Sequence, residues 1–274
     1  MRTTMTVQDI EVLIDGQGPT VVMLHGWPDS PAVWDESVAA LRDGYRCVRF
    51  ALPGYDLRRA PRPVSVDGMC ALVAAIVDAV SPDAPVTLML HDWGCFFGYE
   101  YAARHPDRVA RVVAADIGDT NTGAYLKALT AKEKALIAGY QLWLALAWKL
   151  GPRLPGLASG MTRWMARVIG CRTPAGDIGW QMNYPYAMQW LGAFGGLRGV
   201  ARVDQVFGPR LPTLFLFGTR KPFMFHSTRW LEQLNATPGC AAHGLDAGHW
   251  LMKQQPQAFN RLVRDWLGRG DAAR

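Results

Sequence analysis

Residues 86–95 read VTLMLHDWGC, a short apolar run that gives way to a polar turn. The run Val86–Leu90 lacks polar alternation, which predicts a buried strand of a parallel sheet covered on both faces. Helical periodicity follows over Cys95–Arg104. Asp92 therefore stands between a strand and a helix, at the carboxyl end of the strand, where open α/β sheets bind ligands. An Asp before a helix is also a common N-cap, so a structural role stays open at this point.

The same alternation of strand and helix continues on both sides of this stretch. Further apolar runs predict buried strands at Thr20–Leu24, Arg46–Phe50, Arg111–Ala115 and Thr213–Phe217. Helical periodicity covers Ala32–Leu41, Val66–Val80 with Ser65 as its N-cap, and Pro256–Leu267. The alternation predicts an α/β fold with a doubly wound, mostly parallel sheet.

Residues 119–208 interrupt this pattern with a Trp-rich helical segment. Its most apolar part, Ala135–Trp148, is shorter than the roughly 20 apolar residues that span a bilayer. A helical insertion between two strands of an α/β sheet indicates a cap over the active site. We therefore expect a core of residues 1–118 and 209–274 with a helical cap at 119–208.

Composition narrows the class of protein. The chain has 274 residues, of which half are hydrophobic and 19% are charged, as in a globular α/β domain with an insertion. Its five cysteines are odd in number and lack CxxC spacing, so neither a disulfide framework nor a zinc site is expected. The first residues, MRTTMTVQDIEVLIDG, contain no apolar signal core, and a cytoplasmic location is the expectation.

The net charge of +6 comes entirely from the predicted cap. Residues 119–208 hold ten Lys and Arg against four Asp and Glu, and the remainder holds 19 of each. These basic residues are scattered among Trp, Leu and Ala, without a phosphate-binding glycine loop, so we expect no nucleic-acid partner. Basic residues beside the apolar segment around Trp143 and Trp148 suit weak contact with an anionic membrane surface. Alternatively, those aromatic side chains line a pocket for a lipophilic substrate.

Three short motifs carry candidate chemistry. They are His25-Gly26-Trp27-Pro28 after the first predicted strand, His91-Asp92-Trp93-Gly94-Cys95 after the third, and Gly248-His249-Trp250 near the end of the sequence. Alone, each is ambiguous, because HG can be a simple turn and a single His in a loop is often structural. Their order and spacing together are far more specific.

At these residues the chain resembles the α/β-hydrolase fold family, in the branch of epoxide hydrolases and haloalkane dehalogenases. HGWPDSPAVWD resembles the oxyanion segment of that branch, LPGY at Leu52–Tyr55 its following loop, HDWGC its nucleophile elbow, and GHWLMKQQPQAFNRLVRDWL its histidine segment. The resemblance covers essentially the whole chain. No G-x-S-x-G occurs, which disfavours the serine-esterase version of the fold.

The resemblance implies carboxylate chemistry without a metal or organic cofactor. Asp92 would be the nucleophile that forms an alkyl ester, and His249 the base that activates water. Substrate and oxyanion binding would fall to the segment with His25 and Gly26, and to backbone N–H groups near Trp27 and Trp93.

The acid that orients His249 is where this sequence departs from the family. The usual Asp after the strand TLFLF is replaced by Lys221, in GTRKP. Some members carry the acid at the end of the preceding core strand, which here is Asp116. Asp119 is the second choice, and Asp246 is more typical of a local turn.

The resemblance implies two cap tyrosines as proton donors to an epoxide oxygen. Tyr140 matches the first, and either Tyr184 or Tyr186 matches the second, although all three also suit simple packing. A dehalogenase would use Trp93 to hold halide but often adds an Asn at the position of Trp27, which is absent. The expected function is hydrolysis of lipophilic epoxides to diols. The alternatives are a haloalkane dehalogenase and a non-catalytic binder of hydrophobic ligands; oligomeric state and substrate size stay open.

Overall fold

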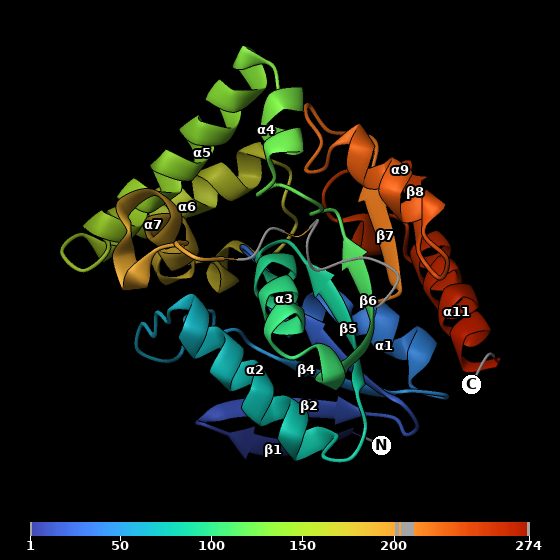
Figure 1. Cartoon of the computed structure of the whole chain (residues 1–274). Coiled ribbons are helices and arrows are strands. Elements are labelled where there is room, and N and C mark those ends of the chain that lie inside the picture. Colours follow the sequence, from blue (N-terminus) through green and yellow to red (C-terminus); the bar gives the residue numbers. More distant parts are fainter. Residues whose placement is uncertain (1, 201–202, 204–210, 273–274) are drawn as a thin grey trace.

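An eight-stranded sheet forms the centre of the molecule (Figure 1). The structure is a computed structural model that describes residues 2–200, 203 and 211–272. The strand order is β1-β2-β4-β3-β5-β6-β7-β8. Pairing is parallel from β4 to β8 along this order, and antiparallel between β1 and β2 and between β2 and β4. The strands are β1 Arg2–Val7, β2 Ile10–Asp15, β3 Thr20–Leu24, β4 Arg46–Phe50, β5 Val86–His91, β6 Val109–Ala115, β7 Thr213–Gly218 and β8 Ala241–Leu245. This confirms the predicted fold class.

The two faces of the sheet are covered by different helices. The core helices are α1 Asp35–Leu41, α2 Val66–Val80, α3 Trp93–Arg104, α9 Thr228–Ala236, α10 Leu251–Gln254 and α11 Pro256–Ala272. Val22 and Leu88 pack in one apolar cluster with residues of α2 and α3, whereas Val21 and Met89 pack in a second cluster with residues of α1 and α11. Successive strand residues therefore face opposite clusters, which is why these strands lack polar alternation.

Several helix boundaries follow from local chemistry. The Ser65 side chain accepts a hydrogen bond from the Gly68 N–H, which makes it the N-cap of α2 as predicted. The predicted helix Ala32–Leu41 is instead a 3₁₀ turn at Pro31–Trp34 followed by α1.

Among the described residues between β6 and β7, four α-helices form the cap. They are α4 Gly123–Ala128, α5 Ala131–Leu150, α6 Pro155–Val168 and α7 Tyr184–Leu191. Figure 1 shows them on the side toward which the arrows of β5 and β6 point. The predicted boundary between residues 208 and 209 lies outside the described residues. Within the described part of the chain, no helix combines the length and the apolar character needed to cross a bilayer.

Candidate active site

Asp92 occupies the turn between β5 and α3. Its backbone has a φ of 51° and a ψ of −125°, in a region that residues other than glycine seldom adopt. Such a turn stores strain and presents its side chain at the end of the sheet. The Asp92 side chain is 14% exposed, so it is reachable from a cavity while being largely desolvated.

His249 lies between the carboxylates of Asp116 and Asp92. Its Nδ1 is 2.6 Å from Oδ2 of Asp116, and its Nε2 is 3.4 Å from Oδ2 of Asp92. Asp116 directly follows β6, is fully buried, and has a φ of 73°. Asp92, His249 and Asp116 therefore lie in one row. Asp92 and Asp116 stand at the ends of β5 and β6, and His249 in the loop before α10.

The second carboxylate oxygen of Asp116 also accepts hydrogen bonds. Its Oδ1 accepts a hydrogen bond from the Gly218 N–H at 3.0 Å and another from the Lys221 ammonium. Burial would raise the pKa of Asp116, but the charge of Lys221 and the hydrogen bond with His249 hold it well below its ordinary value. Lys221 therefore does not replace the acid at this position; it pairs with the acid supplied by β6.

The other two candidate acids do not contact His249. Asp119 is buried and accepts hydrogen bonds from the backbone and hydroxyl of Ser227, both at 2.7 Å, and from the Thr122 hydroxyl at 2.8 Å. Asp246 is exposed and pairs with Arg220 at 3.1 Å. Both carboxylates are therefore occupied by structural partners.

Charge coupling sets the protonation of this row. Burial would lower the pKa of His249, but its hydrogen bonds with Asp116 and Asp92 and their charges raise it from 6.5 to about 9. Burial would raise the pKa of Asp92, yet His249 and the Trp93 backbone N–H bring it below its ordinary value. At neutral pH the unreacted site therefore holds an ionised Asp92 facing an imidazolium.

Two backbone N–H groups contact the Asp92 carboxylate. The Trp27 N–H donates to Asp92 Oδ1 at 2.6 Å, and the Trp93 N–H contributes a second backbone hydrogen bond. A Cβ on Gly26 would lie 2.4 Å from that oxygen, so only glycine leaves this space open. This arrangement suits stabilisation of an oxyanion on Asp92 during ester hydrolysis.

His25 belongs to the same motif but lies behind the cavity wall. It is fully buried, Nε2 accepts from the Leu52 N–H at 3.0 Å, and Nδ1 is 3.1 Å from the Gly26 carbonyl. Burial lowers its pKa to about 4, so the ring is neutral. His25 therefore holds the loop that carries Gly26 and does not line the cavity, in contrast to its expected place among the substrate-binding residues.

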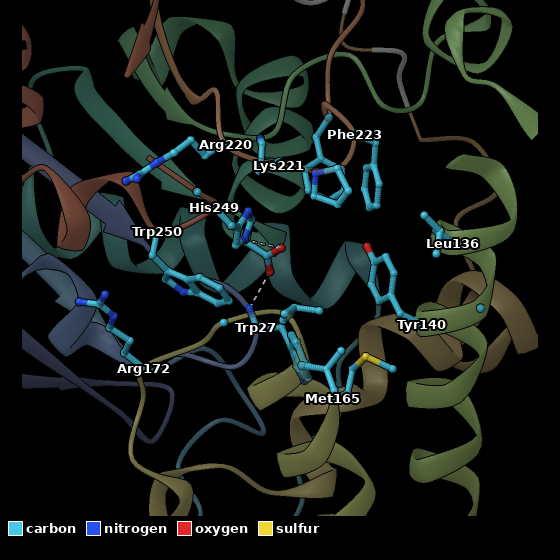
Figure 2. Close-up of a pocket in the computed structure, with 18 of the residues that line it drawn as sticks. Trp27, Leu136, Tyr140, Met165, Arg172, Arg220, Lys221, Phe223, His249 and Trp250 are labelled. Carbon is cyan, nitrogen blue, oxygen red and sulfur yellow. Dashed lines mark hydrogen bonds and ion pairs between the residues drawn. The ribbon is translucent and has the colours of Figure 1, made fainter. Parts of the chain in front are cut away.

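A cavity of about 930 Å³ opens over Asp92 and His249. Trp27, Tyr140 and Tyr186 line it together with apolar side chains that include Leu136, Met165, Val168, Ile169 and Phe223. A second cavity of about 500 Å³ shares Asp92, Tyr140 and Tyr186 with the first. Figure 2 shows Tyr140 and His249 facing the same space from opposite sides.

The structure separates the two tyrosines that the sequence left open. Tyr186 packs edge-on against Trp27, Trp93 and Tyr140, with ring centroids 5.8, 5.3 and 6.1 Å away. Tyr184 lines neither cavity and packs against Tyr55. Its buried hydroxyl has no hydrogen-bond partner. Tyr186, and not Tyr184, therefore lies beside Asp92.

Comparison with known proteins places this site in a family. A family model described as alpha/beta hydrolase fold matches residues 19–256. The chain belongs to the alpha/beta hydrolase fold family. Over 98 residues this hydrolase-fold chain is 39% identical to the "Probable oxidoreductase EphD" of Mycobacterium tuberculosis (strain ATCC 25618 / H37Rv). That match covers 34% of this chain and only 17% of the relative's length.

Solved structures share the fold over nearly the whole chain. An epoxide hydrolase from Bacillus megaterium in complex with an inhibitor has a TM-score of 0.67 at 19% identity, over 97% of this chain and 100% of its own. The haloalkane dehalogenase DbeA-M1 loop variant from Bradyrhizobium elkanii has a TM-score of 0.67 at 18% identity, over 100% and 98%. At such low identities the likeness establishes the common fold.

The chain also carries a buried polar network that the sequence analysis missed. Asp29 accepts hydrogen bonds at 2.7 Å from the Trp250 indole and from the Thr173 hydroxyl of the cap segment. Behind the row of Asp92, His249 and Asp116, His91 Nε2 donates to the His249 carbonyl at 3.1 Å. Asp29 and His91 stand inside the quoted HGWPD and HDWG motifs, but nothing in those motifs indicates that they support His249 from behind.

Two further observations bear on cofactors and halide binding. Among the described residues, no group of three or more His, Cys, Asp or Glu side chains is arranged to hold a metal ion. The Trp27 indole N–H donates to Asn183 at 2.7 Å, and Asn183 in turn donates to Thr162 at 2.8 Å. The Trp27 indole is therefore already engaged in a buried hydrogen bond and does not face the cavity as a donor.

Proposed function

We propose that this hydrolase converts lipophilic epoxides to diols through a covalent ester on Asp92. The observation that carries the proposal is one apolar cavity lined both by the row Asp92–His249, backed by Asp116, and by the tyrosines Tyr140 and Tyr186. Asp92, Tyr140 and Tyr186 also line the second cavity. An epoxide carbon at Asp92 therefore has room for substituents on both sides.

In the first step an oxygen of Asp92 attacks an epoxide carbon. A C–O bond forms to the carboxylate, the strained C–O bond of the ring breaks, and the departing oxygen takes a proton from a tyrosine hydroxyl. Burial raises the pKa of Tyr140 and of Tyr186 well above 10, and the negative charge of Asp92 adds to this rise. Esterification removes that charge, so both hydroxyls become more acidic as the alkoxide forms.

In the second step water cleaves the ester. His249 accepts a proton from water while the water oxygen adds to the ester carbonyl of Asp92, and the resulting oxyanion is held by the Trp27 and Trp93 N–H groups. The intermediate then expels the diol oxygen, which takes the proton back from His249. Because the ester carries no charge, His249 loses the part of its pKa rise that Asp92 supplied and gives up its proton, which restores the tyrosine hydroxyl by way of solvent and leaves His249 a neutral base. After the diol has left, the carboxylic acid of Asp92 passes its proton to His249, and the starting ion pair is regained.

Two alternatives receive less support. A dehalogenase needs N–H donors directed at the departing halide; the Trp27 indole is bound to Asn183, which leaves Trp93 as the one candidate indole donor of the two. In a non-catalytic binder, nothing would require a buried His249 in contact with both Asp92 and Asp116. Burying charged groups costs free energy, and such clusters are typical of functional sites.

The test is a panel of tyrosine variants assayed for diol and halide separately. Tyr186→Phe and Tyr140→Phe are expected to slow epoxide opening by roughly 10²-fold or more, because each removes a general acid. Tyr184→Phe is the matched control and should keep full turnover, since it removes a hydroxyl that lies outside the cavity and has no hydrogen-bond partner. Normal diol formation in all three variants with brisk halide release would establish the dehalogenase instead.

The covalent step is tested with His249→Gln. This variant should still be alkylated by an epoxide but should fail to hydrolyse the ester, so intact-protein mass spectrometry should show an adduct that fragmentation assigns to Asp92. An adduct on Cys95, which lies three residues away, would refute Asp92 as the nucleophile.

A further inference from the structure

The cap carries an unusual amount of exposed apolar surface. Within the described residues, every large hydrophobic side chain that is exposed lies between residues 126 and 194: Leu126, Leu136, Leu142, Leu146, Leu154, Leu157, Trp164, Val168, Ile169, Trp190, Leu191 and Phe194. Single exposed apolar residues are normal, but a gathering of them marks an interaction surface. Trp143 and Trp148, to which the sequence drew attention, are instead half-buried and packed within the cap.

These side chains form one surface over α5, α6 and α7. On α6, Leu157, Trp164 and Val168 are exposed at spacings of seven and four, so they share one helix face. On α5, the exposed Leu142 and Leu146 continue this surface, because the neighbouring Trp143 ring lies 5.2 Å from the Trp164 ring. We call this surface the outer cap face.

The surface continues from α5 to α7. The Trp190 indole of α7 donates to Gln141 of α5 at 2.9 Å, which places the partly exposed Trp190 ring beside the Leu142 turn of α5. The outer cap face therefore extends across three helices, and Figure 1 shows this group of helices standing away from the sheet.

Exposed positive charges lie on the same helices as the outer cap face and in the turns that join them. They are Lys132, Lys134 and Lys149 on α5, Arg153 before α6, Arg167 on α6, and Arg172 after it. Nearby acidic residues are few: Glu133 caps α5 by hydrogen bonds to Thr130, and Asp177 lies in a later turn. Apolar side chains ringed by Lys and Arg match the chemistry of an anionic lipid surface.

The outer cap face also reaches the mouth of the large cavity. Leu136, Val168, Ile169 and Arg172 both belong to the exposed surface and line the 930 Å³ cavity. Figure 2 shows Arg172 and Leu136 at opposite edges of that cavity. A surface placed against the outer cap face would therefore meet the cavity entrance.

We propose that the outer cap face docks on an anionic phospholipid bilayer, so that lipophilic substrate passes from the lipid directly into the cavity. The docking follows from the exposed residues and their charges. Only the passage of substrate rests on the proposed epoxide hydrolysis.

The test is sedimentation of the full chain with vesicles of phosphatidylcholine alone or mixed with phosphatidylglycerol. The protein should sediment with the mixed vesicles at low salt, and less so at high salt. Leu157→Ser combined with Trp164→Ser should lower the bound fraction by roughly tenfold or more, because two large apolar contacts are lost. Both residues lie outside the cavity lining, so hydrolysis of a short, water-soluble epoxide should be unchanged.

A matched charge pair isolates the electrostatic part. Arg153→Gln with Arg167→Gln should weaken binding to the mixed vesicles, whereas Arg261→Gln with Arg264→Gln removes equal charge from exposed positions on α11 and should not. Equal loss in both charge variants would mean that net charge alone drives binding and would overturn the proposal.

Two other outcomes would also overturn docking on lipid. One is the absence of salt-sensitive vesicle binding by the unmodified chain. The other is a dimer, seen by light scattering without lipid, that the Leu157→Ser, Trp164→Ser variant dissociates, because a second copy would then cover the outer cap face. Vesicle binding by a chain that fails to hydrolyse any epoxide would refute the proposed function while supporting the docking.

Discussion

At the scale of single residues, the site is a cluster of two buried negative and two buried positive groups. Asp92 and Asp116 are ionised, His249 has a pKa raised to about 9, and Lys221 contacts Asp116. Buried charges are tolerated when they are paired and hydrogen-bonded, and this cluster sums to zero. Ester formation on Asp92 removes one negative charge. The arrangement that keeps His249 protonated before the reaction therefore lets His249 lose that proton afterwards.

Asp116→Asn tests the acid of the row. Alkylation of Asp92 should continue, but ester hydrolysis should slow by about 10³-fold or more, because a neutral amide cannot stabilise the imidazolium that forms on His249. Rapid-quench kinetics would show a fast burst of adduct followed by slow diol release. Asp246→Asn and Asp119→Asn are the controls, and both should keep the hydrolytic rate within a few-fold of the parent. Steady turnover in Asp116→Asn with collapse in either control would identify a different acid.

Lys221→Met tests the positioning role of the ammonium, which contacts Asp116 and no reacting atom. The positive charge of Lys221 offsets part of the negative charge by which Asp116 stabilises the imidazolium. Removing the ammonium should therefore raise the pKa of His249. Because His249 must be neutral to activate water, the acid limb of single-turnover ester hydrolysis should move to higher pH. The alkylation rate should change less than this limb. A slower reaction with an unmoved pH profile would show that Lys221 only supports the fold, and Lys221→Arg should restore the parental profile.

At the scale of elements, buried strands were the most predictable feature. The apolar runs at Thr20–Leu24 and Arg46–Phe50 match β3 and β4 in full, because both faces of a central parallel strand are covered. The edge elements were missed. β8, Ala241–Leu245, is half-exposed and contains His243 and Gly244, so it lacks the composition of a strand.

The hairpin of β1 and β2 was missed for a different reason. Its two-residue turn is Gln8-Asp9, with φ values of 47° and 63°, where Asn-Gly or Asp-Gly is the usual signal. The strands themselves are identifiable only once the turn between them is recognised. The hairpin is therefore stabilised by the pairing of β2 with β4, a tertiary contact that the local sequence does not indicate.

The proximity of Asp92, His249 and Asp116 was predictable from the sequence, whereas the choice between Tyr184 and Tyr186 was not, for geometric reasons. Asp92 and Asp116 follow adjacent parallel strands, and the topology alone brings such positions to one edge of the sheet. Tyr184 and Tyr186 stand two residues apart on α7, which is about 200° of helix rotation. One of them must face the cavity and the other must face away, and only the packing of α7 decides which.

Gly26→Ala tests the contact between the loop after β3 and the start of α3. The added Cβ would lie 2.4 Å from Asp92 Oδ1 and 2.5 Å from the Trp93 backbone nitrogen, so one of the two elements must shift. Because small displacements of an oxyanion donor cost about 10²-fold or more, both half-reactions should be severely slowed while the circular dichroism spectrum stays native. Gly123→Ala, at the start of α4 with nothing within 4 Å of its Cβ, is the control and should be neutral. Normal turnover in Gly26→Ala would exclude this loop from oxyanion binding.

At the scale of the whole molecule, buried titratable groups predict how stability depends on pH. Burial lowers the pKa of His25 and His226 to about 4 and that of His91 to about 3. The unfolded chain binds protons at these sites below pH 6.5 and the folded chain does not, so they reduce the free energy of unfolding as the pH falls. Asp29 opposes this trend, because burial raises its pKa to about 6 and its protonation favours the folded state below that pH. Three histidines outweigh one carboxyl, so acidification should destabilise the fold.

His249 makes the free energy of unfolding fall at alkaline pH. Its pKa is raised from 6.5 to about 9, so the stabilisation it contributes is fully present below pH 6.5 and is lost as the pH rises through 9. The free energy of unfolding, measured by urea denaturation, should therefore peak near pH 6.5 and fall by up to about 3 kcal/mol toward pH 9. His249→Gln cannot titrate, so its alkaline limb should be much flatter, while an acid limb should persist because the lowered pKa values of His25 and His226 do not depend on His249. Equal alkaline slopes in the two proteins would mean that His249 is not held as an imidazolium between Asp92 and Asp116 in the unreacted molecule, and that the charge balance on which the two-step reaction depends is different.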